Sequence, residues 1–330
     1  MEQAIKECER PARFDMFGDV KQFHGLRGLM SWWVVCGHIA ATVGLPPMWN
    51  TFAVDVFIVL SGFVIFVLLD RKKERYGVYI LRRGIRLFPL YLAVMAVSIA
   101  MLPLAKWTFA HAPFSGANVG RVQLAEAALS NLPIHVLVHL PLAQGLIPQS
   151  VLPSSSPTIV GQAWSISLEW QYYLLAPLLL LGMRSKGQLV LAVAAISALM
   201  ALGVFFDDAF IGNKAPLFTV GATTYLLMRT SKTNSMYAWY WGFLIASIAA
   251  SLFLLSKQIL LPLGLWAAAV ASTRSRFAAP LSRFLTSSFL FWQGDRSYSI
   301  YIVHMIAFIT VAAIMNLSDV KGSFMEQSVS

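Results

Sequence analysis

The sequence predicts an all-α protein, built as a bundle of membrane-spanning helices. Of its 330 residues, 58% are hydrophobic and only 12% are charged, whereas about a quarter of the residues of a soluble domain carry a charge. The mean hydropathy is +0.67. The apolar residues also gather in runs close to the ~20 residues that cross a bilayer as a helix. The chain is therefore expected to be a polytopic membrane protein.

The expected spans follow from the apolar runs. The longer runs are 26–44, 51–69, 87–104, 163–182, 188–206, 237–256 and 297–315, and two weaker ones are 214–229 and 259–273. Segment 121–147 is different because it contains Glu126, Asn131, two histidines and prolines. Such a segment does not suit a lipid-exposed helix, and we interpret it as interfacial or re-entrant. The sequence thus predicts about nine spans.

The basic residues predict the orientation of these spans. Lys and Arg accumulate in the cytoplasmic loops of membrane proteins. With residue 1 in the cytoplasm, the basic clusters at 71–86, 184–186, 229–232 and 274–283 all fall inside, while Asp207 and Asp208 fall outside. A tenth span at 121–147 would invert every later loop and lose this agreement. The N-terminus is therefore expected inside, with a long external loop at 105–162.

The rest of the chain indicates one membrane domain with two polar ends. Residues 1–22 form a predicted cytoplasmic leader without the apolar core and cleavage site of a signal peptide. Residues 23–316 form the membrane domain and 317–330 a polar tail. Cys8 and Cys36 lie in different environments, so free thiols are expected and no metal site. Topology explains the net charge of +10, and no nucleic-acid partner is expected.

Ionisable side chains inside spans are costly and are candidates for function. Asp55 and Glu169 are the only acidic residues well within the predicted spans, each near an outer end. His38 follows Arg27 by eleven residues, which is about 16 Å along a helix and within about 20° of the same face. The first span therefore carries a polar stripe with a base in its outer half.

Five sequence blocks occur in a recognisable order. They are Arg27-x10-His38, FAVDVFIVLSGFVIF at 52–66, RRGIRLFPLY at 82–91, AWSISLEWQYYLLAP at 163–177 and GDRSYSIYIVH at 294–304. Together they resemble the acyltransferase-3 family of integral-membrane acyltransferases, over residues 23–304. The resemblance implies an enzyme that moves an acyl group, such as acetyl, from cytoplasmic acyl-CoA to a hydroxyl of an extracytoplasmic glycan. It also implies the bacterial inner membrane. Family members usually have ten spans, so a truncated or short member is expected.

The resemblance and the residues together suggest catalytic roles. His38 is expected to act as a general base on the acceptor hydroxyl or to hold the acyl group transiently. Asp55 is expected either to orient His38 or to cap the second helix, whose N-terminus favours an anion. A buried Glu169 needs a partner, and we expect it to meet an arginine or to position the acceptor sugar.

The remaining candidates concern binding of the donor and of the acceptor. The basic residues Arg27, Arg82, Arg83 and Arg86 are expected to bind acyl-CoA. Arg82 and Arg86 lie one helical turn apart, where two guanidinium groups suit phosphates. The topology alone also accounts for that basic cluster, and Arg27 also suits a headgroup anchor. The expected acceptor-binding residues are Trp164, Tyr172, Tyr173 and His304. Ser61 and Gly62 are interpreted as small packing residues.

Two other functions would account for parts of this pattern. A transporter or flippase of a glycan or lipid-linked precursor would use the buried ionisable groups as a path. Many transporters contain inverted repeats, and the sequence contains no recognisable repeat. A noncatalytic scaffold would not need Arg27 and His38 on one stripe. Acyl transfer at a bilayer is the function that the sequence favours.

Overall fold

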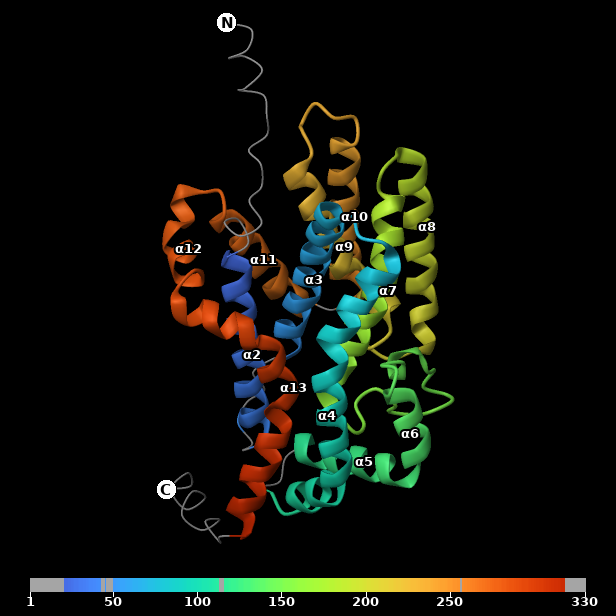
Figure 1. The fold of residues 1–330 in the computed structure, drawn as a ribbon, viewed down its shortest axis with the longest axis vertical. Helices are drawn as coiled ribbons and strands as arrows, with labels where there is room; N and C mark the ends of the chain where they lie inside the picture. Colours follow the sequence, from blue (N-terminus) through green and yellow to red (C-terminus); the bar gives the residue numbers. More distant parts are fainter. Residues whose placement is uncertain (1–20, 43–44, 46–49, 113–115, 256, 318–330) are drawn as a thin grey trace, which may run out of the picture.

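A computed structural model describes residues 21–42, 45, 50–112, 116–255 and 257–317. All regular secondary structure in these ranges is helical, so the predicted all-α class is confirmed. Cys8, nearly all of the predicted leader and nearly all of the polar tail lie outside the described residues. Figure 1 shows the helices arranged along one long axis.

Each apolar run of the sequence coincides with one long helix. These helices are α2 (Lys21–Thr42), α3 (Asn50–Lys72), α4 (Tyr76–Ala110), α7 (Trp164–Gly182), α8 (Lys186–Leu202), α9 (Ile211–Arg229), α10 (Tyr237–Leu254), α11 (Leu260–Ser272) and α13 (Ser288–Leu317). Shorter helices are α5 (Gly116–Ser130), α6 (Leu132–His139) and α12 (Ala279–Leu285). The helices form because long apolar stretches must satisfy their backbone groups internally.

Five of the described helices are long and apolar enough to cross a membrane by length and composition. They are α3, α4, α8 with its continuation to Phe205, α10 and α13. Such helices indicate an integral membrane protein. Helices α2, α7 and α9 contain more polar residues, several of which form the site described below. The number of spans and the orientation of the chain stay predictions.

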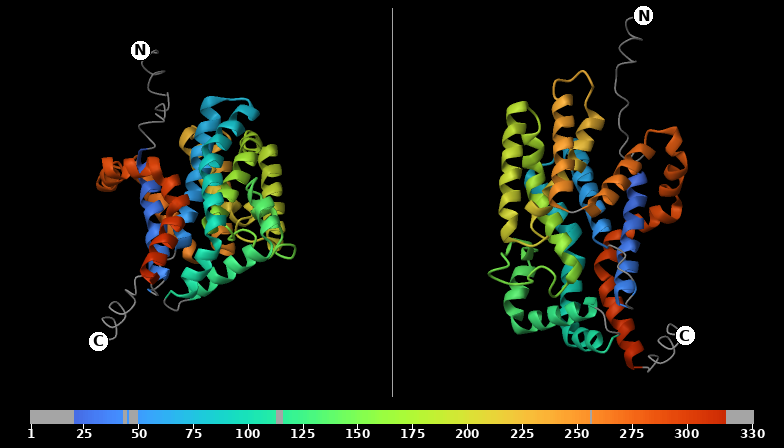
Figure 2. Two further views of the ribbon diagram at one scale, coloured as in Figure 1. Left: turned by 60° about the horizontal axis from the view of Figure 1, so that its bottom comes forward. Right: turned by 180° about the vertical axis from the view of Figure 1, so that it is seen from behind.

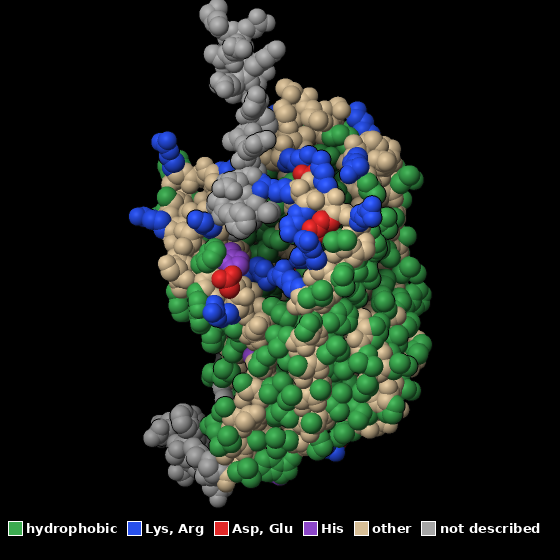
Figure 3. Space-filling view, in the orientation of Figure 1, with side chains coloured by type: hydrophobic (Ala, Val, Ile, Leu, Met, Phe, Trp, Pro, Cys, Tyr) green, Lys and Arg blue, Asp and Glu red, His purple; other side chains and the backbone are tan. Residues whose placement is uncertain are grey.

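The two ends of the molecule differ in their surface. Figures 1 and 2 show α5 and α6 at the lower end of the bundle, where the chain turns across the long axis. Lys and Arg side chains gather in the upper half, whereas hydrophobic side chains cover most of the lower flank in Figure 3. The polar side chains of the site lie on helices that connect these two ends.

Helices α3 and α9 pack against each other at close range. A Cβ atom added to Gly62 on α3 would clash with the carbonyl oxygen of Phe218, and one added to Gly221 on α9 would clash with that of Val59. Glycine lets two helix backbones approach in this way. The interpretation of Gly62 as a packing residue agrees with these contacts, which hold one wall of the site in place.

Helix α4 is unusually long and holds α5 at the lower end. Its 35 residues correspond to about 52 Å, whereas the hydrocarbon core of a bilayer is about 30 Å thick. Near its lower end, Lys106 pairs with Glu126 of α5 at 3.0 Å. Phe109 of the same helix lies under the guanidinium group of Arg121, also on α5, at 4.9 Å.

Candidate active site

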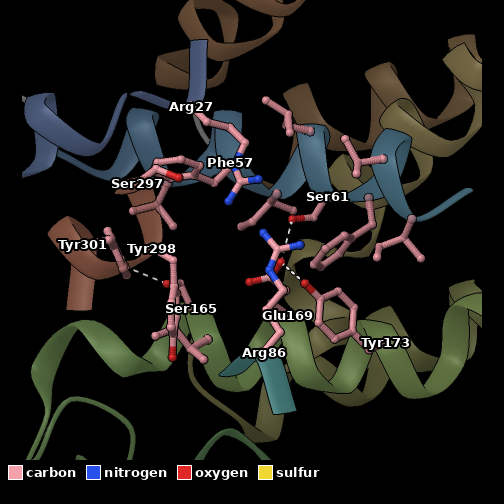
Figure 4. A pocket seen from close by; sticks show the side chains of 17 residues that line it. Arg27, Phe57, Ser61, Arg86, Ser165, Glu169, Tyr173, Ser297, Tyr298 and Tyr301 are labelled. Carbon is pink, nitrogen blue, oxygen red and sulfur yellow. Dashed lines mark hydrogen bonds between the residues drawn. The ribbon is translucent and has the colours of Figure 1, made fainter. Parts of the chain in front are cut away.

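A cavity of about 80 Å³ lies between helices α2, α3, α4, α7, α9 and α13. Its polar lining consists of Arg27, Ser61, Arg86, Ser165, Glu169, Tyr173, Ser297, Tyr298 and Tyr301, and the rest is apolar. Figure 4 shows these side chains converging from helices far apart in the sequence. All five sequence blocks contribute at least one side chain to this polar lining.

Two arginines and one carboxylate define the charge of this cavity. Arg27 comes from α2 and Arg86 from α4, and Figure 4 shows both guanidinium groups pointing into the space beside Glu169. Arg27 is half-buried, whereas Arg86 is exposed and lies at the open side. Two cations and one anion leave a net positive charge. The cavity therefore favours an anionic ligand.

Hydroxyl groups hold the Glu169 carboxylate in place. The Ser61 hydroxyl on α3 donates a hydrogen bond of 3.2 Å to Glu169 Oε1. The Tyr173 hydroxyl donates to the same oxygen from one turn further along α7, because residues four apart share a helix face. The sequence led us to interpret Ser61 as a packing residue only, and its contact with Glu169 makes it part of the site.

The three arginines of the RRGIR block have different surroundings. Arg86 lines the cavity, and the Arg83 guanidinium lies 6.0 Å from the Tyr173 ring centroid. Arg82 is exposed and donates a hydrogen bond of 2.6 Å to Glu74. Arg82 and Arg86 therefore have different neighbours in the structure, and the binding of one ligand by both stays a prediction. Arg82 lies a full turn closer to the end of α4, where Glu74 is within reach.

His38 belongs to a second polar cluster, formed by α2, α5 and α13. Its ring lies 5.1 Å from the ring of His304, measured between centroids. Arg121 Nη2 lies 3.4 Å from His38 Nδ1 and also 3.4 Å from the His38 carbonyl oxygen. We call His38, His304 and Arg121 the histidine cluster. Its members come from positions 38, 121 and 304 of the chain.

Arg121 was not among the residues singled out from the sequence. It lies in the segment that we interpreted as interfacial, where a single arginine gives no signal of function. In the structure its guanidinium group lies over the rings of Phe109 and Phe308, at 4.9 and 5.6 Å. Burial lowers the pKa of Arg121 to about 10, so the side chain remains a cation at neutral pH.

Tyr301 connects the cavity to the histidine cluster. Its ring lines the cavity, and its hydroxyl shares a hydrogen bond of 2.7 Å with Ser165 and donates one of 3.1 Å to the Gln162 carbonyl. The backbone oxygen of Tyr301 accepts a hydrogen bond of 2.7 Å from His304 Nδ1. One turn of α13 thus borders both sites. On α2, Arg27 likewise lines the cavity and His38 belongs to the histidine cluster.

Asp55 has a partner that the sequence did not suggest. Its carboxylate lies 3.0 Å from Lys214 Nζ on α9, and both side chains are buried. The pair joins α3 to α9 near the N-terminal ends of both helices. The predicted alternatives for Asp55 were an orienting contact with His38 or a helix cap. The structure gives Asp55 an ion pair instead, and a catalytic role for it stays a prediction.

The four residues predicted to bind the acceptor lie in different parts of the structure. Tyr173 lines the cavity, and His304 lies beside His38. Tyr172 is fully buried against Phe218, with ring centroids 4.1 Å apart, and donates to the Gly62 carbonyl. Tyr172 therefore packs α7 against α3 and α9. Trp164 is half-buried at the start of α7 and is not part of the cavity lining.

The chain matches one family of known proteins. The sequence model of the acyltransferase-3 family, described as an acyltransferase domain, matches residues 20–326. No curated protein and no solved structure gives a significant match. The family match covers every residue of the cavity and of the histidine cluster. The chain therefore belongs to the acyltransferase-3 family and is an integral-membrane acyltransferase.

Proposed function

We propose that the protein transfers a short acyl group, such as acetyl, from cytoplasmic acyl-CoA to a hydroxyl group of an extracytoplasmic glycan in the bacterial inner membrane. One observation carries the proposal. Arg27 of the cationic cavity and His38 of the histidine cluster lie on the same helix, α2, and Tyr301 of α13 borders both sites. The first suits an anionic donor and the second suits proton transfer.

The donor side of the proposal rests on the two cavity arginines. Coenzyme A carries phosphate groups, for which guanidinium groups are favourable partners. The cavity of about 80 Å³ has room for several water-sized groups, but not for a nucleotide. We therefore place the phosphates at the open side near Arg86, with the acyl-bearing end directed inward past Arg27.

The distance between the two sites suits this donor. Arg27 and His38 are about 16 Å apart along α2. The pantetheine arm of coenzyme A is a long flexible chain with the thioester at its end. A donor anchored by its phosphates near Arg86 and Arg27 therefore extends its thioester toward the histidine cluster, where the acceptor hydroxyl would arrive from the other side.

The reaction then needs one proton acceptor. A histidine takes the proton of the acceptor hydroxyl, the oxygen bonds to the thioester carbon, the carbon–sulfur bond breaks, and the coenzyme A thiolate receives the proton. A positioned base contributes roughly 10²- to 10⁴-fold to such a rate. In the alternative route, the acyl group passes first to the His38 imidazole and then to the hydroxyl. Both routes need His38.

The experiment is acyl transfer by purified protein in liposomes, with acetyl-CoA and glycans extracted from the host. Release of coenzyme A thiol and mass spectrometry of the glycan are the readouts. His38→Gln should abolish both, whereas His111→Gln, at the exposed end of α4, should retain them. A wild-type rate for His38→Gln would exclude the proposal. Glycan movement across the liposome without thiol release would favour the transporter instead.

A further inference from the structure

The histidine cluster contains two imidazole rings, and their hydrogen bonds assign them different roles. We infer that Nε2 of His304 is the atom that takes the proton of the acceptor hydroxyl, and that Arg121 keeps the neighbouring His38 in the form that donates a hydrogen. This inference rests on the proposed function. It selects His304 as the base, which the proposed function leaves open, and it keeps His38 essential as a hydrogen-bond donor.

The tautomer of His304 follows from its backbone contact. Its Nδ1 atom lies 2.7 Å from the carbonyl oxygen of Tyr301. A carbonyl oxygen can only accept a hydrogen bond, so Nδ1 carries the hydrogen. In a neutral imidazole the other nitrogen then holds a lone pair. Nε2 of His304 is therefore a base whose lone pair points away from the α13 backbone.

That lone pair is buried without a partner. Within the described residues, Nε2 of His304 accepts no hydrogen bond, and only 8% of the residue is exposed. A buried acceptor left unpaired is unfavourable, because it has lost its hydrogen bond to water. Such an atom is satisfied when a hydroxyl group arrives beside it. The acceptor of the proposed reaction supplies that group.

His38 has the opposite arrangement because of Arg121. A guanidinium group has only donors, and Arg121 Nη2 lies 3.4 Å from His38 Nδ1. Nδ1 must therefore hold the lone pair, and the hydrogen is on Nε2. A proton added at Nδ1 would place two positive charges in contact, which Coulomb repulsion opposes. His38 thus acts as a donor toward the reacting oxygen or carbonyl and not as the base.

The two rings together match the chemistry of an alcohol. Their centroids are 5.1 Å apart, so the rings are close enough to act on one bound hydroxyl group. The hydroxyl proton moves to His304 Nε2, the oxygen forms the bond to the acyl carbon, and the carbon–sulfur bond breaks. The leaving thiolate then takes the proton from His304. The hydrogen bond to the Tyr301 carbonyl stabilises the His304 imidazolium that exists between these steps.

The chain contains a matched control. His139 on α6 also donates from Nδ1 to a backbone oxygen, that of His135, at 2.7 Å, and its buried Nε2 has no partner within the described residues. Burial lowers its pKa to about 4. His139 belongs to neither α2 nor α13, and within the described part of the chain its ring lies beside His135 and not beside Tyr301. An unpaired Nε2 alone should therefore not confer a catalytic role.

The test compares His304→Gln with His139→Gln and His38→Gln in the liposome assay, after acetyl-CoA binding has shown that each variant is folded. His304→Gln should lower kcat by roughly 10²- to 10⁴-fold with unchanged donor affinity, and His139→Gln should retain wild-type kcat. Added imidazole should restore part of the activity of His304→Gly, which a purely structural role would not allow. Arg121→Lys should keep more activity than Arg121→Gln.

The outcomes separate the inference from the proposed function. If His304→Gln stays within tenfold of wild type while His38→Gln is inactive, the base is His38, and the inference fails although the proposed function stands. If imidazole does not restore His304→Gly, although this variant binds acetyl-CoA, the inference fails as well. If neither histidine variant changes acyl transfer, the proposed function itself is wrong.

Discussion

The carboxylate of Asp55 on α3 and the ammonium group of Lys214 on α9 lie 3.0 Å apart, with only 10% and 8% of their side chains exposed. The pair lies in the same helix contact as the close approach at Gly62 and Gly221. Each charge is held in the protein interior by the other. Removing one charge therefore leaves the other without compensation.

Lys214→Met should destabilise the protein by about 3–5 kcal/mol, because breaking a buried pair leaves one charge unpaired. The double variant Asp55→Leu/Lys214→Met should recover most of that loss. Unfolding of the purified protein in detergent measures both effects as a double-mutant cycle. A loss below about 1 kcal/mol in the single variant would show that the pair contributes little. A double variant as unstable as the sum of the single variants would show that the two charges are independent.

Arg86→Lys should weaken acyl-CoA binding roughly ten- to hundredfold, because a charge-assisted bond contributes about 1.5–3 kcal/mol and lysine lacks the planar pair of donors. Arg82→Lys should bind the donor like wild type, since Arg82 pairs with Glu74. Titration of acetyl-CoA into the detergent-solubilised protein measures both affinities. Equal affinities for the two variants would place the donor phosphates away from Arg86.

Gly62→Ala should destabilise the protein by about 1–3 kcal/mol, because the new methyl group overlaps the backbone of α9 and separates the two helices. Gly242→Ala is the control, since a Cβ atom there meets nothing within 4 Å and alanine favours a helix by about 1 kcal/mol. Thermal unfolding in detergent compares the two variants. Equal stabilities would mean that α3 and α9 do not pack at this distance.

Cysteine labelling tests the orientation of the chain. Cys8 and Cys36 are first replaced by serine. Ser150→Cys in the predicted external loop should then react with a membrane-impermeant reagent in intact cells, whereas Lys72→Cys should not. Ser150 is exposed, whereas Ser155 in the same loop is fully buried and would react poorly on either side. Labelling of Lys72→Cys but not of Ser150→Cys would reverse the proposed sides of donor and acceptor.

The helices were predictable from the sequence because their signal is local. An apolar run of sufficient length becomes a helix in a bilayer whatever its neighbours are, and each run at 26–44 through 297–315 coincides with one helix. The Arg27 and His38 stripe was predictable for the same reason, since the spacing within one helix fixes the relative position of two side chains. Glu169 stood out because a carboxylate in a span needs a partner.

The contacts between helices were not predictable in this way. The sequence pattern does not distinguish Arg82 from Arg86. In the structure they lie one turn of α4 apart, so that Arg82 pairs with Glu74 whereas Arg86 lines the cavity. Ser61 looks like a packing residue until α7 brings Glu169 to it. Arg121 contacts His38, which lies 83 positions away in the sequence, and Lys214 pairs with Asp55, which lies 159 positions away. Such pairings depend on the tertiary arrangement, which no local pattern encodes.

The length of α4 has a consequence for how a polymer reaches the enzyme. At about 52 Å, this helix is longer than even the ~40–45 Å of a bilayer with its headgroups. In the predicted orientation, its last turns and α5 would form a platform of protein at the outer water interface, and α5 carries Arg121. If the acceptor is the proposed extracytoplasmic glycan, its strand would reach this platform from solution and would not have to enter sideways through lipid. The reaction should then depend on how much of the strand is free to move, and less on where the strand is anchored.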